Sequence, residues 1–338
     1  MENLLEACIE LDTLAVEVYA LFAAGTEDDS LKDVFLQLRA QESDHISWWM
    51  DAQQRVDSGA VVIPDESAKY VTTYMKAIVT TFRSMLDSAA PRALTDDDRL
   101  ALAASLEFFA LDPVFSLLIH ASDPLLGVTR NKAYDEHVEL LLATMEARHS
   151  WLLGPHIAML RTARIDSEAP VPDHLHDPVT GLPLRSLAEN AIDALCRDSS
   201  RDGSAISLAV IDLSLHPLYV LDPIHAERTL LRITFVMTSL LRFTDLMVRL
   251  DDGHKFAVVM PATSSSVASA KTAALAGAAT GVATAASGGE KSDWATSAVI
   301  TLPPGPQRCG AESAFSAVEA LLGDARTSGK ALAVGELA

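Results

Sequence analysis

Apolar residues recur every three to four positions through the first half of the chain, which predicts a series of amphipathic helices. We expect these helices over residues 2–24, 30–58, 66–89, 97–121 and 131–162, with polar or Gly/Pro-containing breaks between them. The pattern changes in the second half, where Ser207–Asp212 and Phe256–Pro261 are short apolar runs typical of strands. Ala268–Gly289, rich in Ala, Ser, Thr and Gly, indicates a further helix with a loose connection. The sequence therefore predicts a multidomain protein, an α domain followed by an α/β domain.

Acidic residues interrupt the apolar stripes of the first two predicted helices. Asp12 falls on the core-facing stripe of the first helix, and Glu42 and His45 fall on that of the second. A carboxylate and an imidazole three residues apart lie on one face of a helix, where both can reach one metal ion. Glu10 is an alternative to Asp12 if the first helix is rotated.

The predicted fourth helix repeats this spacing with Glu146 and His149. In the third helix either Glu107 or Asp112 can supply an acid, and superposing the two halves with an offset of one hundred residues favours Asp112. Pro113 argues for Glu107 instead, because a proline inside a helix removes a backbone hydrogen bond. Three other polar residues of the fourth helix are interpreted as non-ligands: His137 and Glu139 as surface groups, and His156 as a residue that either faces solvent or supports a ligand.

Taken together these residues resemble the ferritin-like, rubrerythrin-type superfamily over roughly residues 1–160. The resemblance implies a four-helix bundle with a crossover helix and a centre of two iron ions, or manganese, that meets oxygen or peroxide. Mapped onto this sequence, the implied ligands are Asp12, Glu42, His45, Asp112 or Glu107, Glu146 and His149. Aspartate replaces the usual glutamate on at least one helix, and no rubredoxin-like cysteine quartet follows.

Composition narrows the classes of partner. The 338 residues carry a net charge of -20, so no basic surface is expected to displace counterions from nucleic-acid phosphates. The three cysteines are far apart and lack CxxC spacing, which argues against a zinc or disulfide framework. No run of eighteen apolar residues is found, and the N-terminus lacks a signal-peptide pattern, so we expect a cytoplasmic protein.

A proline-containing, acidic stretch suggests a linker over 163–176, between domains at 1–162 and 177–338. The segment Asp177–Arg185 that follows is similar to the opening of GGDEF domains, the nucleotide-cyclase-like modules that make cyclic di-GMP. The strand ending in Asp212, the segment from Arg242 to Leu250 and the strand Phe256–Pro261 follow in that family's order. The resemblance implies a GGDEF-type sheet flanked by helices.

The residues expected to carry cyclase chemistry depart from the family pattern. The signature hairpin reads Asp251-Asp252-Gly253-His254-Lys255-Phe256, with histidine and lysine in the places of two acids. A lysine there would repel magnesium, and only Asp212 remains as a metal ligand because Ser214 replaces the second acid of the strand exit. We therefore expect no diguanylate cyclase activity, although Arg326 and Lys330 keep positive charge where the family contacts phosphates.

Arg242-x-x-Asp245 matches the family's product-inhibition site, in which arginine clamps cyclic di-GMP. Two interpretations stay open: a retained site for cyclic di-GMP or GTP, and a surface ion pair beside a strand.

The leading hypothesis is a signalling protein in which the di-iron domain senses oxygen, peroxide or redox state. It would control an inactive GGDEF domain that binds a ligand or a partner signalling protein, and the resemblance implies a homodimer. The alternative is a di-iron oxidase or peroxidase in which the GGDEF-like domain is regulatory.

Overall fold

A computed structural model gives the fold. The residues that it describes are 2–58, 79–80, 82–83, 86–87, 93–110, 127–167, 177, 179–202, 204–250, 254–289, 294–302 and 310–336. Contacts divide the chain into two compact units, one made of Met1–Ser150 with Leu160–His174 and the other of Trp151–Met159 with Leu175–Ala338. The predicted crossover helix over 66–89 lies largely outside the described residues.

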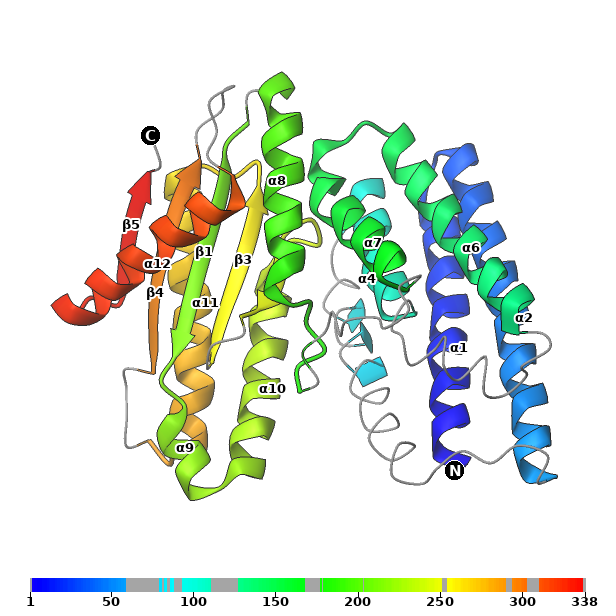
Figure 1. Cartoon of the computed structure of the whole chain (residues 1–338), viewed down its shortest axis with the longest axis horizontal. Helices are drawn as coiled ribbons and strands as arrows, with labels where there is room; N and C mark the ends of the chain where they lie inside the picture. The colour runs from blue at the N-terminus through cyan, green and yellow to red at the C-terminus, as the bar shows by residue number, and fades with distance from the viewer. Residues whose placement is uncertain are drawn as a thin grey trace. The chain divides into compact units, whose positions relative to one another are not determined.

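Helices α1 (Glu2–Gly25) and α2 (Asp29–Asp57) form an antiparallel hairpin in the first unit (Figure 1). The connection is short, and Asp28 ends it by accepting the backbone N–H groups of Ser30 and Leu31 through Oδ1, at 3.0 and 3.2 Å. Such a cap satisfies donors that the first turn of a helix leaves without partners. The two helices pack through aromatic rings, with the Phe22 and Phe35 centroids 5.5 Å apart.

Helices α4 (Asp96–Ala110) and α6 (Gly127–Ala147) complete the part of the bundle that carries the polar cluster described below. Thr95 caps α4: its hydroxyl accepts the Asp98 N–H at 3.1 Å, and Asp98 Oδ2 accepts the Thr95 N–H at 2.9 Å. This reciprocal arrangement is a capping box. Asp112 and Pro113 follow α4 in sequence but lie outside the described residues.

The predicted helix over 131–162 is wrong in one respect, because the structure breaks it. Helix α6 ends at Ala147, His149 has a φ of 51°, and a short 3-10 turn, Trp151–Leu153, precedes α7 (Gly154–Ser167). Pro155 explains the new start, since proline lacks an N–H and disfavours a helical residue before it. Helix α7 also runs into the predicted linker, so at least residues 163–167 are helical.

The strands of the second unit that are described form one five-stranded sheet. They are β1 (Ile206–Leu213), β2 (Leu246–Arg249), β3 (Lys255–Pro261), β4 (Ala295–Leu302) and β5 (Leu332–Glu336), in the order β2-β3-β1-β4-β5. The central strand β1 is antiparallel to both of its neighbours, and β5 is parallel to β4. The two apolar runs expected to be strands are confirmed as β1 and β3.

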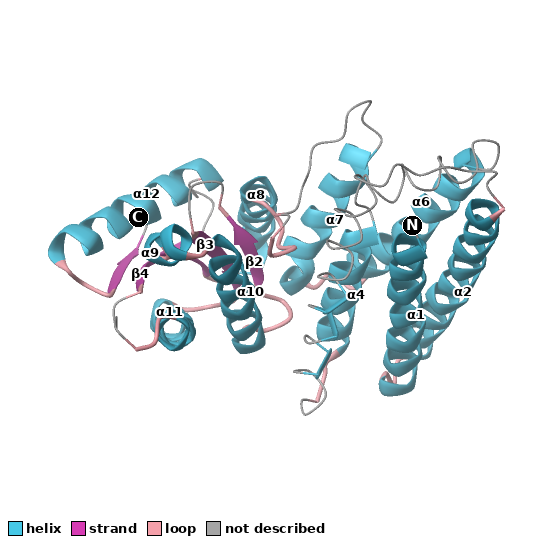
Figure 2. Cartoon of the chain, turned by 90° about the horizontal axis from the view of Figure 1, so that it is seen from below, coloured by secondary structure: helices cyan, strands magenta, loops and turns pink. Residues whose placement is uncertain are grey.

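Helices cover both faces of this sheet (Figure 2). Helices α8 (Arg185–Asp202) and α12 (Ala311–Ser328) lie on one face, and α10 (Pro223–Leu240) and α11 (Ser265–Ala286) lie on the other, with the short α9 (His216–Leu221) before α10. The mixed sheet between two helical layers agrees with the predicted α/β fold class. Helix α11 confirms the helix expected from the Ala-rich run. Among the described residues, no helix combines the length and the apolar character needed to span a membrane.

Candidate functional site

Five titratable side chains meet inside the first unit, and none is more than 3% exposed. They come from four helices: Asp12 from α1, Glu42 and His45 from α2, Glu107 from α4 and His137 from α6. We refer to these five residues as the acid–histidine cluster. Charged and polar groups are rarely buried unless they are paired or bind a metal, so the cluster needs a chemical explanation.

The cluster divides into two sets of three that share Glu42. In one set the ligand atoms of Asp12, Glu42 and His45 all lie within 4.8 Å of one another, and in the other those of Glu42, Glu107 and His137 do. Glu42 Oε2 is 3.0 Å from His45 Nδ1, whereas its Oε1 is 3.2 Å from His137 Nε2. Each carboxylate oxygen of Glu42 therefore faces a different imidazole.

Residues outside the cluster hold three of its members. Trp49 Nε1 donates a hydrogen bond to Asp12 Oδ2 at 2.7 Å, and the Tyr19 hydroxyl donates to Glu107 Oε1. On the far side of the His137 ring, Nδ1 lies 2.9 Å from Gln41 Oε1. Glu107 Oε2 is buried and has no hydrogen-bond partner among the described residues. The cluster thus keeps acceptor capacity that the described part of the chain does not use.

Burial raises the pKa of two of the three carboxyl groups. Burial and then the charge of Glu107 raise the pKa of Glu42 to about 8, and burial and then the charge of Glu42 raise the pKa of Asp12 well above its ordinary value. Like charges that share a buried site cannot all ionise without a compensating cation. Without added positive charge, Asp12 and Glu42 are therefore favoured in their protonated forms.

The two histidines shift in opposite directions. Burial alone would lower the pKa of His137, but the charges of Glu107 and Glu42 outweigh it and raise that pKa to about 9. Burial and then the charge of His137 lower the pKa of His45 to about 3. For Glu107 the burial effect is outweighed by His137 and by the hydrogen bonds from His137 and Tyr19, so its pKa is lowered. One imidazolium–carboxylate pair, His137 with Glu107 at 2.9 Å, therefore carries the charge at neutral pH.

The structure brings together four of the residues predicted as metal ligands: Asp12, Glu42, His45 and Glu107. Asp112, the other candidate in the third helix, lies outside the described residues. Glu10, the alternative to Asp12, has a side chain 41% exposed and pairs with Arg83 at 3.3 Å.

The remaining two predicted ligands, Glu146 and His149, are not at the cluster. The Glu146 side chain is 42% exposed and accepts a 2.6 Å hydrogen bond from Arg161, and His149 is exposed in the turn after α6. The break after Ala147 is the physical reason, because the two residues no longer share one helical face. At Glu146 and His149 the Glu-x-x-His spacing spans the end of a helix and does not bring the two side chains together.

His137 takes their place, and its interpretation as a surface group was wrong. It is fully buried and reaches both Glu42 and Glu107. A signal was available, because Leu141 and Met145 follow at helical spacing and are also buried. The neighbouring helical face that contains Leu142 and Glu146 was taken as the core-facing one instead. Glu139 is confirmed as a surface group, 58% exposed, whereas His156 is 2% exposed and does not face solvent.

In the second unit, the acid at the end of β1 is already paired. Asp212, at 9% exposure, forms an ion pair with Arg326 near the end of α12. In the strand register, Lys255 lies opposite Asp212, so a second cation is placed near the same strand end. The preceding residue His254 stacks on Tyr219 of α9, with ring centroids 4.5 Å apart and planes at 6°. Asp251–Gly253 lie outside the described residues.

Arg242 and Asp245 do not form a pair through their side chains. Asp245 is buried, and its Oδ2 accepts the backbone N–H of Arg242 at 2.9 Å and the Lys271 ammonium at 2.5 Å. The Arg242 side chain is exposed. Asp245 thus closes the turn before β2 and anchors it to α11. The expectation of a surface ion pair is replaced by a buried pair with Lys271.

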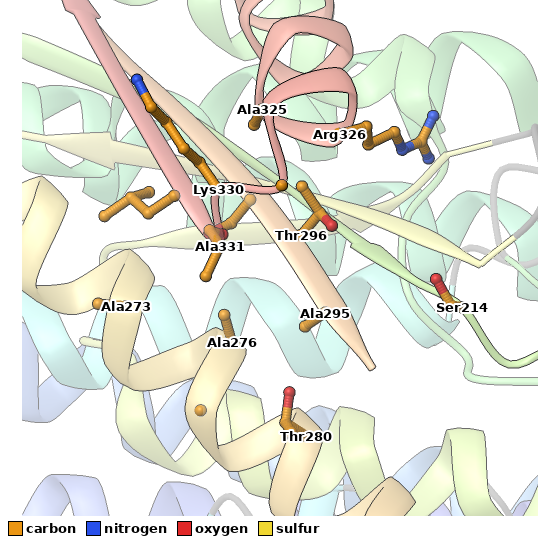
Figure 3. Close-up of a pocket in the computed structure, with 14 residues that line it drawn as sticks. Ser214, Ala273, Ala276, Thr280, Ala295, Thr296, Ala325, Arg326, Lys330 and Ala331 are labelled. Carbon is orange, nitrogen blue, oxygen red and sulfur yellow. The ribbon is translucent and has the colours of Figure 1, made fainter. Parts of the chain in front are cut away.

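A cavity of about 490 Å³ lies between α11, β4 and the turn that joins α12 to β5 (Figure 3). Small side chains of α11, among them Ala273 and Ala276, make one wall. Arg326 and Lys330 contribute the cations, and their side chains extend in different directions in Figure 3. The guanidinium of Arg326 is committed to Asp212, which leaves Lys330 as the other cation of the lining.

Comparisons with known proteins give matches among solved structures. No protein-family model matches the sequence, and no curated protein matches it. Solved structures of GGDEF domains do match. Part of the chain is similar to GGDEF domains.

Three of these structures illustrate the similarity. The coiled coil and GGDEF domain of DgcB from Caulobacter crescentus, in complex with c-di-GMP, is 15% identical; the match covers 52% of this chain and 89% of that one, with a TM-score of 0.42. The diguanylate cyclase SiaD from Pseudomonas aeruginosa, in complex with its activator SiaC, is 22% identical, with 66% and 84% covered and a TM-score of 0.41. The FimX GGDEF domain from Pseudomonas aeruginosa is 19% identical, with 48% and 99% covered and a TM-score of 0.37. At these identities and TM-scores, function has to be argued from the residues themselves.

Proposed function

We propose that the acid–histidine cluster binds two iron ions, with manganese as the alternative, and that Glu42 would help to hold both. The supporting observation is the position of Glu42, whose two oxygens face two different imidazoles in two overlapping sets of ligands. One ion would be held by Asp12, Glu42 and His45, and the other by Glu42, Glu107 and His137. In this proposal α1, α2, α4 and α6 are the ligand-bearing helices of a ferritin-like bundle.

The residues present fit such ions chemically. Three carboxylates and two imidazoles are the mixed oxygen and nitrogen donors that iron and manganese accept. The buried Glu107 Oε2 offers a further donor atom. The raised pKa values of Asp12 and Glu42 indicate a site that is short of positive charge, which bound cations would supply.

Bound iron would supply oxidation and reduction with oxygen or peroxide. The chain's own contribution is to hold the donors in place and to restrict water. Trp49 fixes Asp12 and Tyr19 fixes Glu107, while apolar neighbours such as Leu38 and Leu141 are fully buried. We propose that the unit uses this chemistry to sense oxygen, peroxide or redox state.

Iron analysis of the full-length protein tests the centre. After anaerobic reconstitution with ferrous iron and removal of excess metal, we expect close to two iron ions per chain and a change in the visible spectrum on exposure to air. Fewer than about one ion per chain, with no spectral change, would contradict the proposal. Many turnovers of peroxide per iron centre would instead favour the oxidase or peroxidase alternative.

We propose further that the second unit is a GGDEF-type output domain in cyclic di-GMP signalling that binds a ligand or a protein and does not make cyclic di-GMP. Asp212, the remaining acid at the β1 end, is neutralised by Arg326 and lies in register with Lys255. Two cations at this position oppose the binding of the divalent ions that phosphoryl transfer requires.

The output proposal is tested in two measurements on the full-length protein. Incubation with GTP and magnesium or manganese should give no cyclic di-GMP, while an active diguanylate cyclase assayed beside it gives product. Calorimetry with cyclic di-GMP then asks whether the domain is a receptor, with Arg242→Ala as the variant that removes the exposed guanidinium. Formation of cyclic di-GMP by the purified protein would overturn the first part.

A further inference from the structure

His137 meets its partners inside and outside the acid–histidine cluster through different ring nitrogens. Its Nε2 lies between Glu107 Oε1 and Glu42 Oε1, at 2.9 and 3.2 Å, while its Nδ1 lies 2.9 Å from Gln41 Oε1. The two ring nitrogens therefore have separate tasks.

Gln41 reaches His137 because of its place on α2. It directly precedes Glu42, so adjacent residues of one helix serve both sides of the same imidazole: Glu42 lies on the Nε2 side and Gln41 on the Nδ1 side. Gln41 and His137 are 96 positions apart in the chain, so their contact joins α2 to α6. A partly buried amide in this position has little reason to be there for solubility alone.

The chemistry of the amide oxygen decides which nitrogen is available. An amide oxygen only accepts hydrogen bonds, so Nδ1 has to carry the proton when it faces Gln41 Oε1. A neutral imidazole then has its lone pair on Nε2. Residues that hold the second nitrogen of a ligating histidine set both its tautomer and its ring orientation.

We propose that Gln41 is the positioning residue that fixes His137 as the Nδ1–H tautomer and makes Nε2 its metal-binding atom; this inference rests on the proposed metal centre. In this proposal Gln41 raises the affinity for metal through His137 and does not itself contact the metal. Loss of such a partner typically weakens metal binding about 10- to 100-fold.

Cobalt(II) is the probe, because its visible bands report the donors around it and its affinity can be measured by competition with a chelator. Full-length wild type is compared with Gln41→Leu, which removes the acceptor, and Gln41→Glu, which keeps one. Gln37→Leu is the matched control, since Gln37 lies one turn earlier on α2 and is exposed. Circular dichroism and thermal unfolding establish that each variant is folded.

We expect Gln41→Leu to bind the cobalt ion held by Glu42, Glu107 and His137 about 10- to 100-fold less tightly, with altered bands. Gln41→Glu should restore binding, and Gln37→Leu should match wild type. Equal affinity and identical bands in wild type and Gln41→Leu would overturn the positioning role while leaving the metal centre intact. A wild-type protein that binds neither cobalt nor iron would instead overturn the proposed function.

A second measurement does not use the Gln41 variants. In zinc-loaded wild type labelled with ¹⁵N-histidine, the His137 signals, identified by their loss in His137→Gln, should show a protonated Nδ1 and a zinc-bound Nε2. Zinc on Nδ1 would contradict the inference.

Discussion

The two units treat their buried acids in opposite ways. In the second unit Asp212 and Asp245 are neutralised by cations of the chain itself, Arg326 and Lys271. In the first unit Asp12, Glu42 and Glu107 share one imidazolium, that of His137. A site in which each acid has its own cation has little need of an external one, whereas in the acid–histidine cluster three acids share one cation of the chain. The comparison teaches that a candidate metal site is recognised from the partners of its acids and not from their number.

The largest effect is expected from the shared carboxylate. Glu42→Ala removes a donor from both halves of the cluster, so bound iron should fall from two ions per chain to less than about one. Glu146→Ala is the control, because that acid pairs with Arg161 on the surface, and it should keep the wild-type iron content. Metal analysis by mass spectrometry measures both. Iron loss in Glu146→Ala with retention in Glu42→Ala would reverse the assignment.

The buried pair in the second unit gives the next effect. Lys271→Ala leaves the Asp245 carboxylate buried without its cation, which should lower the free energy of unfolding by about 3 kcal/mol. Chemical denaturation measures this loss. Arg242→Ala removes an exposed side chain from the same turn and should change stability by less than about 0.5 kcal/mol. Equal effects of the two variants would show that Lys271 does not neutralise Asp245.

A third kind of buried titratable group appears in α7. Burial lowers the pKa of His156 to about 4, and its Nδ1 has no hydrogen-bond partner among the described residues. The unfolded chain, with an ordinary pKa near 6.5, binds a proton before the folded chain does, so stability is lost as pH falls from about 6.5 to 4. The lowered pKa corresponds to about 3 kcal/mol over that window.

His156→Gln should remove this share of the acid sensitivity, because its side chain does not titrate. Denaturation curves at a series of pH values measure the slope. His149→Gln is the matched control, since His149 is exposed, and it should retain the wild-type slope. An unchanged slope in His156→Gln would mean that other groups account for the acid sensitivity.

The smallest effect concerns the pair at the β1 end. The Arg326 side chain is 47% exposed, so Arg326→Ala should cost no more than about 1 kcal/mol of stability. If the pairing with Arg326 were all that prevents catalysis, this variant would form cyclic di-GMP from GTP. We expect none, because Lys255 still lies opposite Asp212 and Ser214 stands in the place of an acid. Formation of cyclic di-GMP by Arg326→Ala would show that the ion pair between Arg326 and Asp212 alone prevents catalysis in the wild-type protein.

Local pattern was sufficient for much of the fold. The apolar stripes of α1 and α2 placed Asp12, Glu42 and His45 on the core side. The continuous apolar runs of β1 and β3, which are almost entirely buried, were enough to predict these strands. The residues that pattern could not place depend on contacts distant in sequence. His137 contacts Gln41 and Glu107, which come from other helices. The pairing of Asp212 with Arg326 joins positions more than a hundred residues apart.

The assumption of internal symmetry accounts for the misplaced ligands. The repeated Glu-x-x-His spacing made Glu146 the counterpart of Glu42, but α6 ends at Ala147 and the chain turns before Pro155. A helical spacing motif has meaning only where the helix continues. The same three-residue spacing brings Glu42 and His45 together in the middle of α2 and marks a helix end in α6.

The double engagement of Glu42 also bears on how the protein would respond to metal supply. With one oxygen turned toward each half of the cluster, the first ion to arrive would orient the carboxylate for the second. Uptake would then be steep, with few half-filled molecules, and the switch between empty and filled protein would occur over a narrow range of free iron concentration.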